Sequence, residues 1–186
     1  DKLLKTGIGT KALERVLQKL GQKKVTSGKY TMVVDPLNSR RLLAPVLGAL
    51  YGSGLQQKNS FLLDKLNTKI GADKLNLVDE PHIIGATGAR YFDSEGVATE
   101  RRPIVENGVL KTYFIDTYNS VKMDVEPTVN SPSLLVLQPG NKDVNGLVAD
   151  IQKGILVTGF NGGNCNSSTG DFSYGIEGFL IENGKL

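Results

Sequence analysis

The segment YFDSEGVATERRPIVENGVLKTYFID, residues 91–116, places turn-forming residues between two apolar runs. Its Asn-Gly pair is flanked by apolar residues, which is the strongest short signal for a β-hairpin because both central residues of a type I′ turn need positive φ. A similar block, GFLIENGKL, occupies residues 178–186. We therefore predict two hairpins and a second half of the chain that is rich in strands.

The first half of the sequence has helical periodicity. Apolar residues recur at helical spacing in residues 10–20, 38–54 and 61–71, the last as a short helix that feeds a loop. Residues 28–36 are strand-like, with Asp35-Pro36 as the expected end of the strand, and residues 74–81 are strand-like as well. Helices followed by a strand-rich region favour an α+β fold with a largely antiparallel sheet.

Local signals set the expected ends of these elements. Gly21 is a helix stop, and Asn38 or Ser39 is the expected N-cap of the helix over 38–54. Pro45 predicts a kink or a later start of that helix. A late helix is predicted over 143–154, with Asp143 as cap and Gly154 as stop, followed by a strand over 155–160 and a polar, glycine-rich loop over 161–173.

Composition limits the class of protein. With 39% hydrophobic and 22% charged residues, the chain of 186 residues is globular. Its net charge of +3 is dispersed, so direct binding to nucleic acid is not expected, and no apolar run approaches the ~18 residues of a membrane span. The single cysteine, Cys165, excludes an intrachain disulfide and fits a reducing compartment.

The inventory of catalytic groups is small. His82 is the only histidine, and no HExxH, CxxC, GxSxG or phosphate-binding motif is present. His82 and Cys165 could form a thiol–imidazole pair, because a thiolate nucleophile needs a nearby base. The simpler interpretation is a turn histidine and an inert loop cysteine.

Two further groups are candidates for binding a peptide. Asp93 and Glu95 stand at i and i+2, so in an extended strand they would face the same side, whereas in a turn they would accept hydrogen bonds from amides around Gly96. The loop 161–173 is rich in small residues and could accept a peptide strand by main-chain hydrogen bonds, or it could be an ordinary hairpin loop. Its candidate residues are Asn164, Thr169, Gly170, Asp171 and Ser173.

Several blocks occur together in a specific order: FDSEGVATERRPIVENGVL, LQPG, IQKGILVTG and STGDFSYGIEGFLIENGKL. In this combination the sequence resembles the TldD/PmbA family, once called modulators of DNA gyrase and now regarded as metalloproteases, from about residue 10 onward. The resemblance implies a large, barrel-like, mostly antiparallel sheet with a few flanking helices. It also implies bacterial or archaeal cytoplasm, pairing of a TldD-type with a PmbA-type subunit, and unfolded peptides threaded into an internal cavity.

The same resemblance divides the chain. Residues 1–27 would be a helix and linker left from an upstream N-terminal domain, and residues 28–186 would be the C-terminal domain. That domain would be truncated at its C-terminal end, because IENGKL looks like a hairpin cut off mid-strand.

One departure from the family pattern concerns zinc. TldD-type subunits carry two zinc ligands and a general base on an HExxxH helix, and Leu43, Ala44 and Gly48 occupy those places here. Aliphatic side chains cannot bind zinc, which needs imidazole, thiolate or carboxylate donors. The family's third ligand, a cysteine, would lie beyond Leu186. A further departure is Leu134, where many relatives carry asparagine.

The resemblance therefore implies a PmbA-type subunit without metal, which lines a peptide chamber while a TldD-type partner holds the zinc. A homodimer is the other expected assembly. Two alternatives stay open: a self-sufficient hydrolase using Cys165 or carboxylates, and a regulatory protein for a gyrase-related or toxin–antitoxin partner.

Overall fold

The computed structural model describes residues 7–186, which fall into two compact units with a boundary between Tyr30 and Thr31. In the first unit, α1 (Ile8–Leu17) confirms the helix predicted over 10–20, shifted towards the N-terminus. None of its side chains is buried. Tyr30 closes this unit locally, since its hydroxyl donates to the carbonyl of Thr26 at 3.1 Å.

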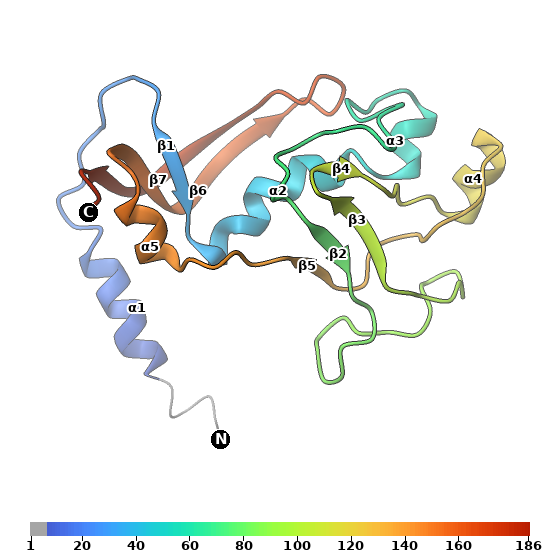
Figure 1. Ribbon diagram of the computed structural model, residues 1–186, viewed down its shortest axis with the longest axis horizontal. Helices are drawn as coiled ribbons and strands as arrows, with labels where there is room; N and C mark the ends of the chain where they lie inside the picture. The colour runs from blue at the N-terminus through green and yellow to red at the C-terminus, as the bar shows by residue number, and fades with distance from the viewer. Residues whose placement is uncertain (1–6) are drawn as a thin grey trace. The chain divides into compact units, whose positions relative to one another are not determined.

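The second unit contains two sheets (Figure 1). A three-stranded sheet has the order β1 (Thr31–Val34), β6 (Lys153–Cys165), β7 (Phe172–Glu182), with β1 parallel to β6 and β6 antiparallel to β7. A four-stranded antiparallel sheet has the order β4 (Val109–Leu110), β3 (Arg102–Glu106), β2 (Leu77–Asp79), β5 (Leu135–Leu137).

The α+β class is confirmed, but a single barrel-like sheet is not. The described residues form two sheets, and neither closes on itself. The first Asn-Gly turn joins β3 to β4 in the four-stranded sheet, whereas the second follows β7 of the three-stranded sheet.

Both Asn-Gly turns are confirmed. Asn107 and Gly108 have φ of 50° and 76°, and Asn183 and Gly184 have the same pair of values. Two successive residues with positive φ are what a type I′ turn requires.

The helix predicted over 38–54 is two helices, α2 (Ser39–Gly48) and α3 (Gly52–Gln56), preceded by the short 3₁₀ helix η2 (Pro36–Asn38). The break follows from tertiary hydrogen bonds: the Phe114 N–H donates to the Leu50 carbonyl, and the Gly52 N–H donates to the Phe114 carbonyl. Asn38 is the N-cap residue of α2, as predicted, but its side chain makes no capping hydrogen bond and instead donates to the Thr158 carbonyl at 2.8 Å.

Other boundaries also moved. No helix forms within residues 61–71, where Asp64 and Asn67 adopt positive φ and interrupt any helical run. Asp143 caps α5 (Val144–Ala149) as predicted, accepting the Gly146 N–H at 2.7 Å. However, α5 ends before Gly154, which lies in β6. The remaining helix is α4 (Thr117–Met123).

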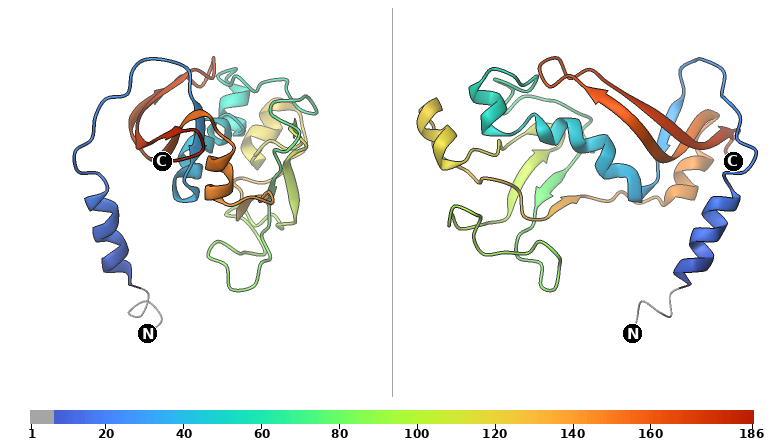
Figure 2. Two further views of the ribbon diagram at one scale, coloured as in Figure 1. Left: turned by 60° about the vertical axis from the view of Figure 1, so that its left-hand side comes forward. Right: turned by 180° about the vertical axis from the view of Figure 1, so that it is seen from behind.

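Each sheet has its own apolar core. The end of α2 and residues from the 49–77 segment pack on the four-stranded sheet, with Leu50, Ile104 and Leu110 fully buried. The helix α5 packs on the three-stranded sheet around Val148, Leu156 and Ile181 (Figure 2). A small apolar cavity of about 80 Å³ lies beside Val46 of α2. Among residues 7–186, no helix has both the length and the apolar character needed to cross a membrane.

Candidate functional site

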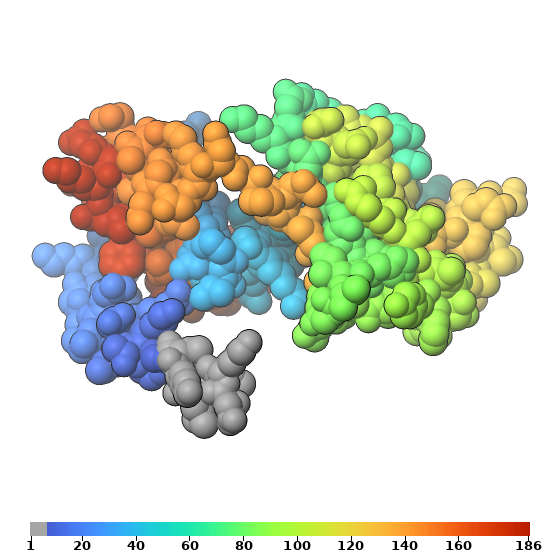
Figure 3. Space-filling model, turned by 60° about the horizontal axis from the view of Figure 1, so that its bottom comes forward, coloured from blue at the N-terminus to red at the C-terminus, as the bar shows by residue number. Residues whose placement is uncertain are grey.

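A cleft of about 680 Å³ lies between α2 and β5 (Figure 3). One wall is formed by α2, and the other by β5 and the residues that directly precede it. The floor includes Leu77 of β2. Arg40 is the only charged residue among those that line it. The lining residues are Ser39, Arg40, Leu43, Ala44, Leu47, Gly48, Tyr51, Leu77, Thr87, Pro132, Ser133, Leu134, Leu135 and Leu137.

The strand β5 is an edge strand, because it pairs with β2 only. The Glu80 N–H donates to the Leu134 carbonyl, and the Gln138 N–H donates to the Asn76 carbonyl, both at 2.9 Å. Hydrogen-bonded and non-hydrogen-bonded pairs alternate in an antiparallel ladder. The backbone groups of Leu135 and Leu137 therefore point away from β2, towards the open edge.

A buried carboxylate and an arginine hold the chain segment that precedes β5. Asp79, at the end of β2, accepts the N–H groups of Ser133 and Leu134 at 2.8–3.0 Å. Arg90 donates to the Ser133 hydroxyl at 2.9 Å and to the Ser131 carbonyl at 2.6 Å. This clamp fixes the wall of the cleft formed by Pro132, Ser133 and Leu134. Sequence reasoning missed Asp79 and Arg90, although an aspartate that ends an apolar strand is a recognisable signal.

Asp93 is buried and accepts three main-chain hydrogen bonds. Its Oδ1 accepts the N–H groups of Glu95 and Val97, and its Oδ2 accepts that of Asn130 at 3.0 Å. Burial raises the pKa of Asp93, but these three donors and the nearby Arg90 charge outweigh burial and hold the pKa below its ordinary value. Asp93 therefore organises a turn, as in the second of the two interpretations.

Glu95 faces a different partner. It is exposed, and its Oε2 accepts the N–H and the hydroxyl of Thr117 at 3.0 and 3.2 Å, while Gly96 completes the turn at φ 81°. The two carboxylates thus have separate partners and do not form a facing pair.

The polar loop is shorter than predicted. β6 continues to Cys165 and β7 starts at Phe172, so Asn164 and Ser173 are paired strand residues and the loop is residues 166–171. The strand prediction over 155–160 was too short because glycines and asparagines continue the ladder through bulges.

Contacts within the loop fix its shape. The Thr169 hydroxyl donates to Asp171 Oδ2 at 2.7 Å. Gly170 has φ of 80°, and a Cβ there would lie 2.9 Å from the Phe61 ring. Gly170 therefore turns the hairpin tip and packs closely against Phe61.

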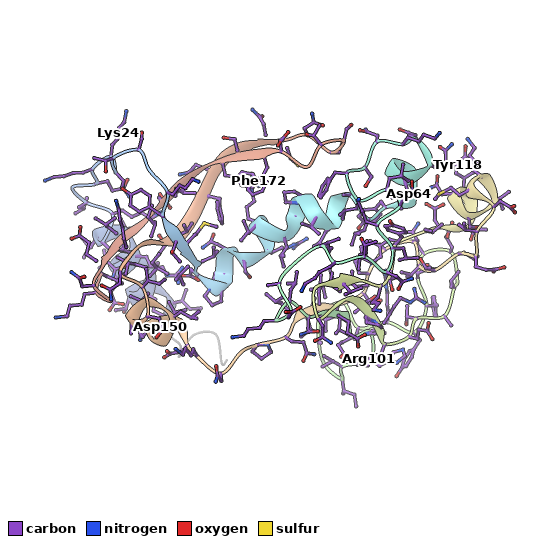
Figure 4. All side chains as sticks on the ribbon, turned by 45° about the horizontal axis from the view of Figure 1, so that its top comes forward. Lys24, Asp64, Arg101, Tyr118, Asp150 and Phe172 are labelled. Atoms are coloured by element: carbon purple, nitrogen blue, oxygen red, sulfur yellow. The ribbon has the colours of Figure 1, made fainter. Side chains whose placement is uncertain are left out.

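The structure does not bring these two groups of candidates together. In Figure 4, Phe172 on β7 and Arg101, which follows the Asp93 turn, lie on opposite sides of α2. Within residues 7–186, no hydrogen bond or ion pair joins the 93–96 turn to the 164–173 segment, and neither lines the cleft. Their role in binding a peptide stays a prediction.

His82 and Cys165 lie on different elements. The Thr99 hydroxyl lies 3.3 Å from His82 Nε2, and the Tyr91 ring packs on the imidazole with 5.5 Å between centroids. Cys165 ends β6 opposite Phe172. No thiol–imidazole pair forms.

The residues expected at the family's zinc-binding places do lie together at the cleft. Leu43, Ala44 and Gly48 line its α2 wall. They offer no donor atom that zinc accepts, so this wall does not fit the metal. In the part of the chain that the structure describes, no group of three or more His, Cys, Asp or Glu residues could hold a metal ion.

The class of protein that this sequence matches is the C-terminal domain of a metallopeptidase family. Residues 27–186 match the family described as PmbA/TldA metallopeptidase C-terminal domain, so the chain belongs to that family. A metalloprotease PmbA homolog from Buchnera aphidicola subsp. Acyrthosiphon pisum is 31% identical over 189 residues, covering 100% of this chain and 42% of that protein.

Two crystal structures extend the similarity to the fold. A protein described as a modulator of DNA gyrase from Bacteroides thetaiotaomicron has a TM-score of 0.96 and 72% identity, covering 98% of this chain and 42% of that one. TldE from Thermococcus kodakarensis has a TM-score of 0.79 and 25% identity, covering 94% of this chain and 44% of that one. This chain thus spans less than half the length of these relatives.

Proposed function

We propose that the protein is a non-catalytic subunit of a PmbA/TldD-type metalloprotease complex and forms part of the wall of its peptide chamber. One observation carries the proposal. The helix α2 presents Leu43, Ala44 and Gly48 to a cleft, at the places where the resemblance puts the ligands and general base of an HExxxH helix.

The zinc in this proposal belongs to a TldD-type partner. A bound zinc ion lowers the pKa of its water towards ~7 and so supplies the nucleophile. This chain would contribute the aliphatic cleft and its strand edge. An assembly with a second copy of the same chain is the other arrangement to be tested, and the cytoplasm is the proposed location.

The substrate class in this proposal is an unfolded peptide. The 93–96 turn and the 164–173 segment are proposed as outer parts of the peptide path, because both are largely exposed loops or strand ends. A barrel-like sheet is likewise proposed only for the whole protein, since this chain spans 42% of its Buchnera relative.

The test uses the full-length protein that carries this chain, alone and mixed with an HExxxH-bearing relative. Alone, it should hold less than one zinc per chain and cleave no unfolded peptide. The mixture should form a stable complex and cleave the peptide, and a matched mixture should be inactive when the partner's HExxxH glutamate is replaced by glutamine. One tightly held zinc in the isolated protein, lost on changing residues 43–48, would contradict the proposal.

A further inference from the structure

We infer that the cleft between α2 and β5 selects an extended peptide segment with the pattern acidic–any–aliphatic–any–aliphatic, and that Arg40 determines the acidic position. The inference rests on the proposed function, because it concerns how the metal-free subunit would recognise a peptide. It adds a sequence preference to the proposed binding of an unfolded peptide.

The open edge of β5 sets the conformation of the ligand. The main-chain groups of Leu135 and Leu137 point into the open edge, and no residue in the described range 7–186 pairs with them. An added strand satisfies such groups by main-chain hydrogen bonds. The other pairings of this sheet are antiparallel, and antiparallel pairs are the commoner kind, so we assign the ligand the antiparallel direction.

The walls set the aliphatic positions. Leu135 and Leu137 are two residues apart, so their side chains share one face, and both line the cleft opposite α2. Ligand residues paired with these two leucines would point their side chains to the same face. They would contact Leu43, Ala44 and Leu47 of α2, which accept aliphatic groups and offer no hydrogen bond.

The only charged side chain among the residues that line the cleft determines the acidic position of the ligand. Arg40 lies in the first turn of α2, is exposed, and is the only charged residue of the lining. The start of α2 is tied to β6 through the Asn38–Thr158 hydrogen bond, and β5 leads into α5, which packs on the same sheet. The start of α2 therefore lies towards the end of the cleft where β5 ends (Figures 1 and 2), and Arg40 belongs to this first turn.

The direction of the ligand strand decides whether Arg40 meets the C-terminal carboxylate or a side-chain carboxylate of the ligand. An antiparallel ligand has its N-terminal end near the end of β5, so its C-terminal carboxylate would leave at the opposite end of the cleft. The carboxylate that meets Arg40 is then a side chain, two residues before the first aliphatic one. A guanidinium forms paired hydrogen bonds with such a carboxylate.

The test measures binding of fluorescent, end-blocked peptides to the full-length protein without any partner, by fluorescence anisotropy. A peptide with the pattern Glu-Thr-Leu-Thr-Val should bind about fivefold more tightly than its Gln-Thr-Leu-Thr-Val counterpart at low salt. Arg40→Gln should abolish this preference. Arg41→Gln is the matched control and should keep it, because Arg41 points to the Tyr174 ring and the Gly162 carbonyl.

Main-chain pairing is tested with N-methylated peptides. Methylation of the Leu and Val nitrogens should remove binding, because these N–H groups would face β5, whereas methylation of the two Thr nitrogens should leave it. Equal binding of the Glu and Gln peptides, a preference that survives Arg40→Gln, or equal tolerance of both methylation patterns would overturn the inference. None of these outcomes depends on zinc or peptide cleavage, so failure here is distinct from failure of the proposed function.

Discussion

Replacing Asp93 by asparagine should destabilise the fold at neutral pH and weaken its response to acid. The side chain is buried and accepts three N–H groups, from Glu95, Val97 and Asn130. These bonds close the turn at residues 93–97 and tie it to Asn130, in the segment that leads into β5. Because the partners are main-chain N–H groups held in place by the fold, they cannot turn away towards another acceptor.

The magnitude follows from how an amide would fit. Its single oxygen would stay on the side of Glu95 and Val97, where two donors converge, so its NH₂ group would face the Asn130 N–H. One buried donor then loses its acceptor and meets another donor. A hydrogen bond to a charged group is worth about 1.5–3 kcal/mol and an unsatisfied buried donor costs about 1–3 kcal/mol, and such terms overlap, so we expect a loss of about 2–3 kcal/mol.

The pH dependence has a definite sign. The folded pKa of Asp93 lies below its ordinary value of 3.8, so the folded state binds this proton less readily than the unfolded chain does. The contribution of Asp93 is therefore complete above the unfolded pKa and is lost as pH falls through the folded pKa. Below about pH 4, protonation of Asp93 should lower the unfolding free energy of the wild type, and Asp93→Asn should lack this loss.

Urea unfolding at several pH values between about 7 and 3 measures both effects. Glu95→Gln is the control, because Glu95 is exposed and glutamine keeps an oxygen that can accept from Thr117, and it should change stability by less than about 0.5 kcal/mol. If Asp93→Asn kept wild-type stability at neutral pH and instead lost peptide binding, the turn-forming role argued for Asp93 would be wrong.

Other substitutions test the packing and the chemistry. Val46→Ile should raise the unfolding free energy by about 0.5–1 kcal/mol by filling the adjacent apolar cavity, and a lower melting temperature would mean that the site is already full. Gly178→Ala should cost about 3 kcal/mol or more in urea unfolding, since its Cβ would lie 1.9 Å from the Leu156 carbonyl oxygen, whereas Gly140→Ala, with open space around it, should cost little. Cys165→Ser should leave peptide cleavage by the reconstituted complex nearly unchanged, and a loss of several orders of magnitude would instead support a thiol nucleophile.

Features decided by neighbouring residues could be predicted from the sequence. The two Asn-Gly turns and the Asp143 cap depend on local φ preferences and on one side-chain hydrogen bond, and all three are present. The Asp35-Pro36 stop after β1 is also local, since Asp35 accepts the Leu37 N–H and proline starts η2.

Features decided by distant partners could not be predicted. The helix over 38–54 breaks because Phe114 hydrogen-bonds to Leu50 and Gly52, which no window of the sequence contains. The glycine-rich part of β6 pairs as a strand because β7 lies beside it, against its low intrinsic strand propensity.

The candidate site was predictable only in part. The positions of Leu43, Ala44 and Gly48 came from the resemblance, and the structure places them at the cleft. The Asp79–Arg90 clamp was missed because most of its partners are main-chain groups of residues 131–134, and main-chain groups leave no trace in composition or spacing.

The pairing of β1 with β6 also determines an order of events during folding. The β6–β7 hairpin and the four-stranded sheet are built from segments between residues 77 and 182. In contrast, β1 pairs with β6, which is far along the chain. The nearby hydrogen bond between Asn38 and Thr158 spans 120 residues. Folding of the intervening chain shortens the loop that this pairing has to close and so lowers its entropic cost. During synthesis on the ribosome, Met32 and Val33 would thus stay unpaired until β6 emerges, so β1 is the last strand of its sheet to find its partner.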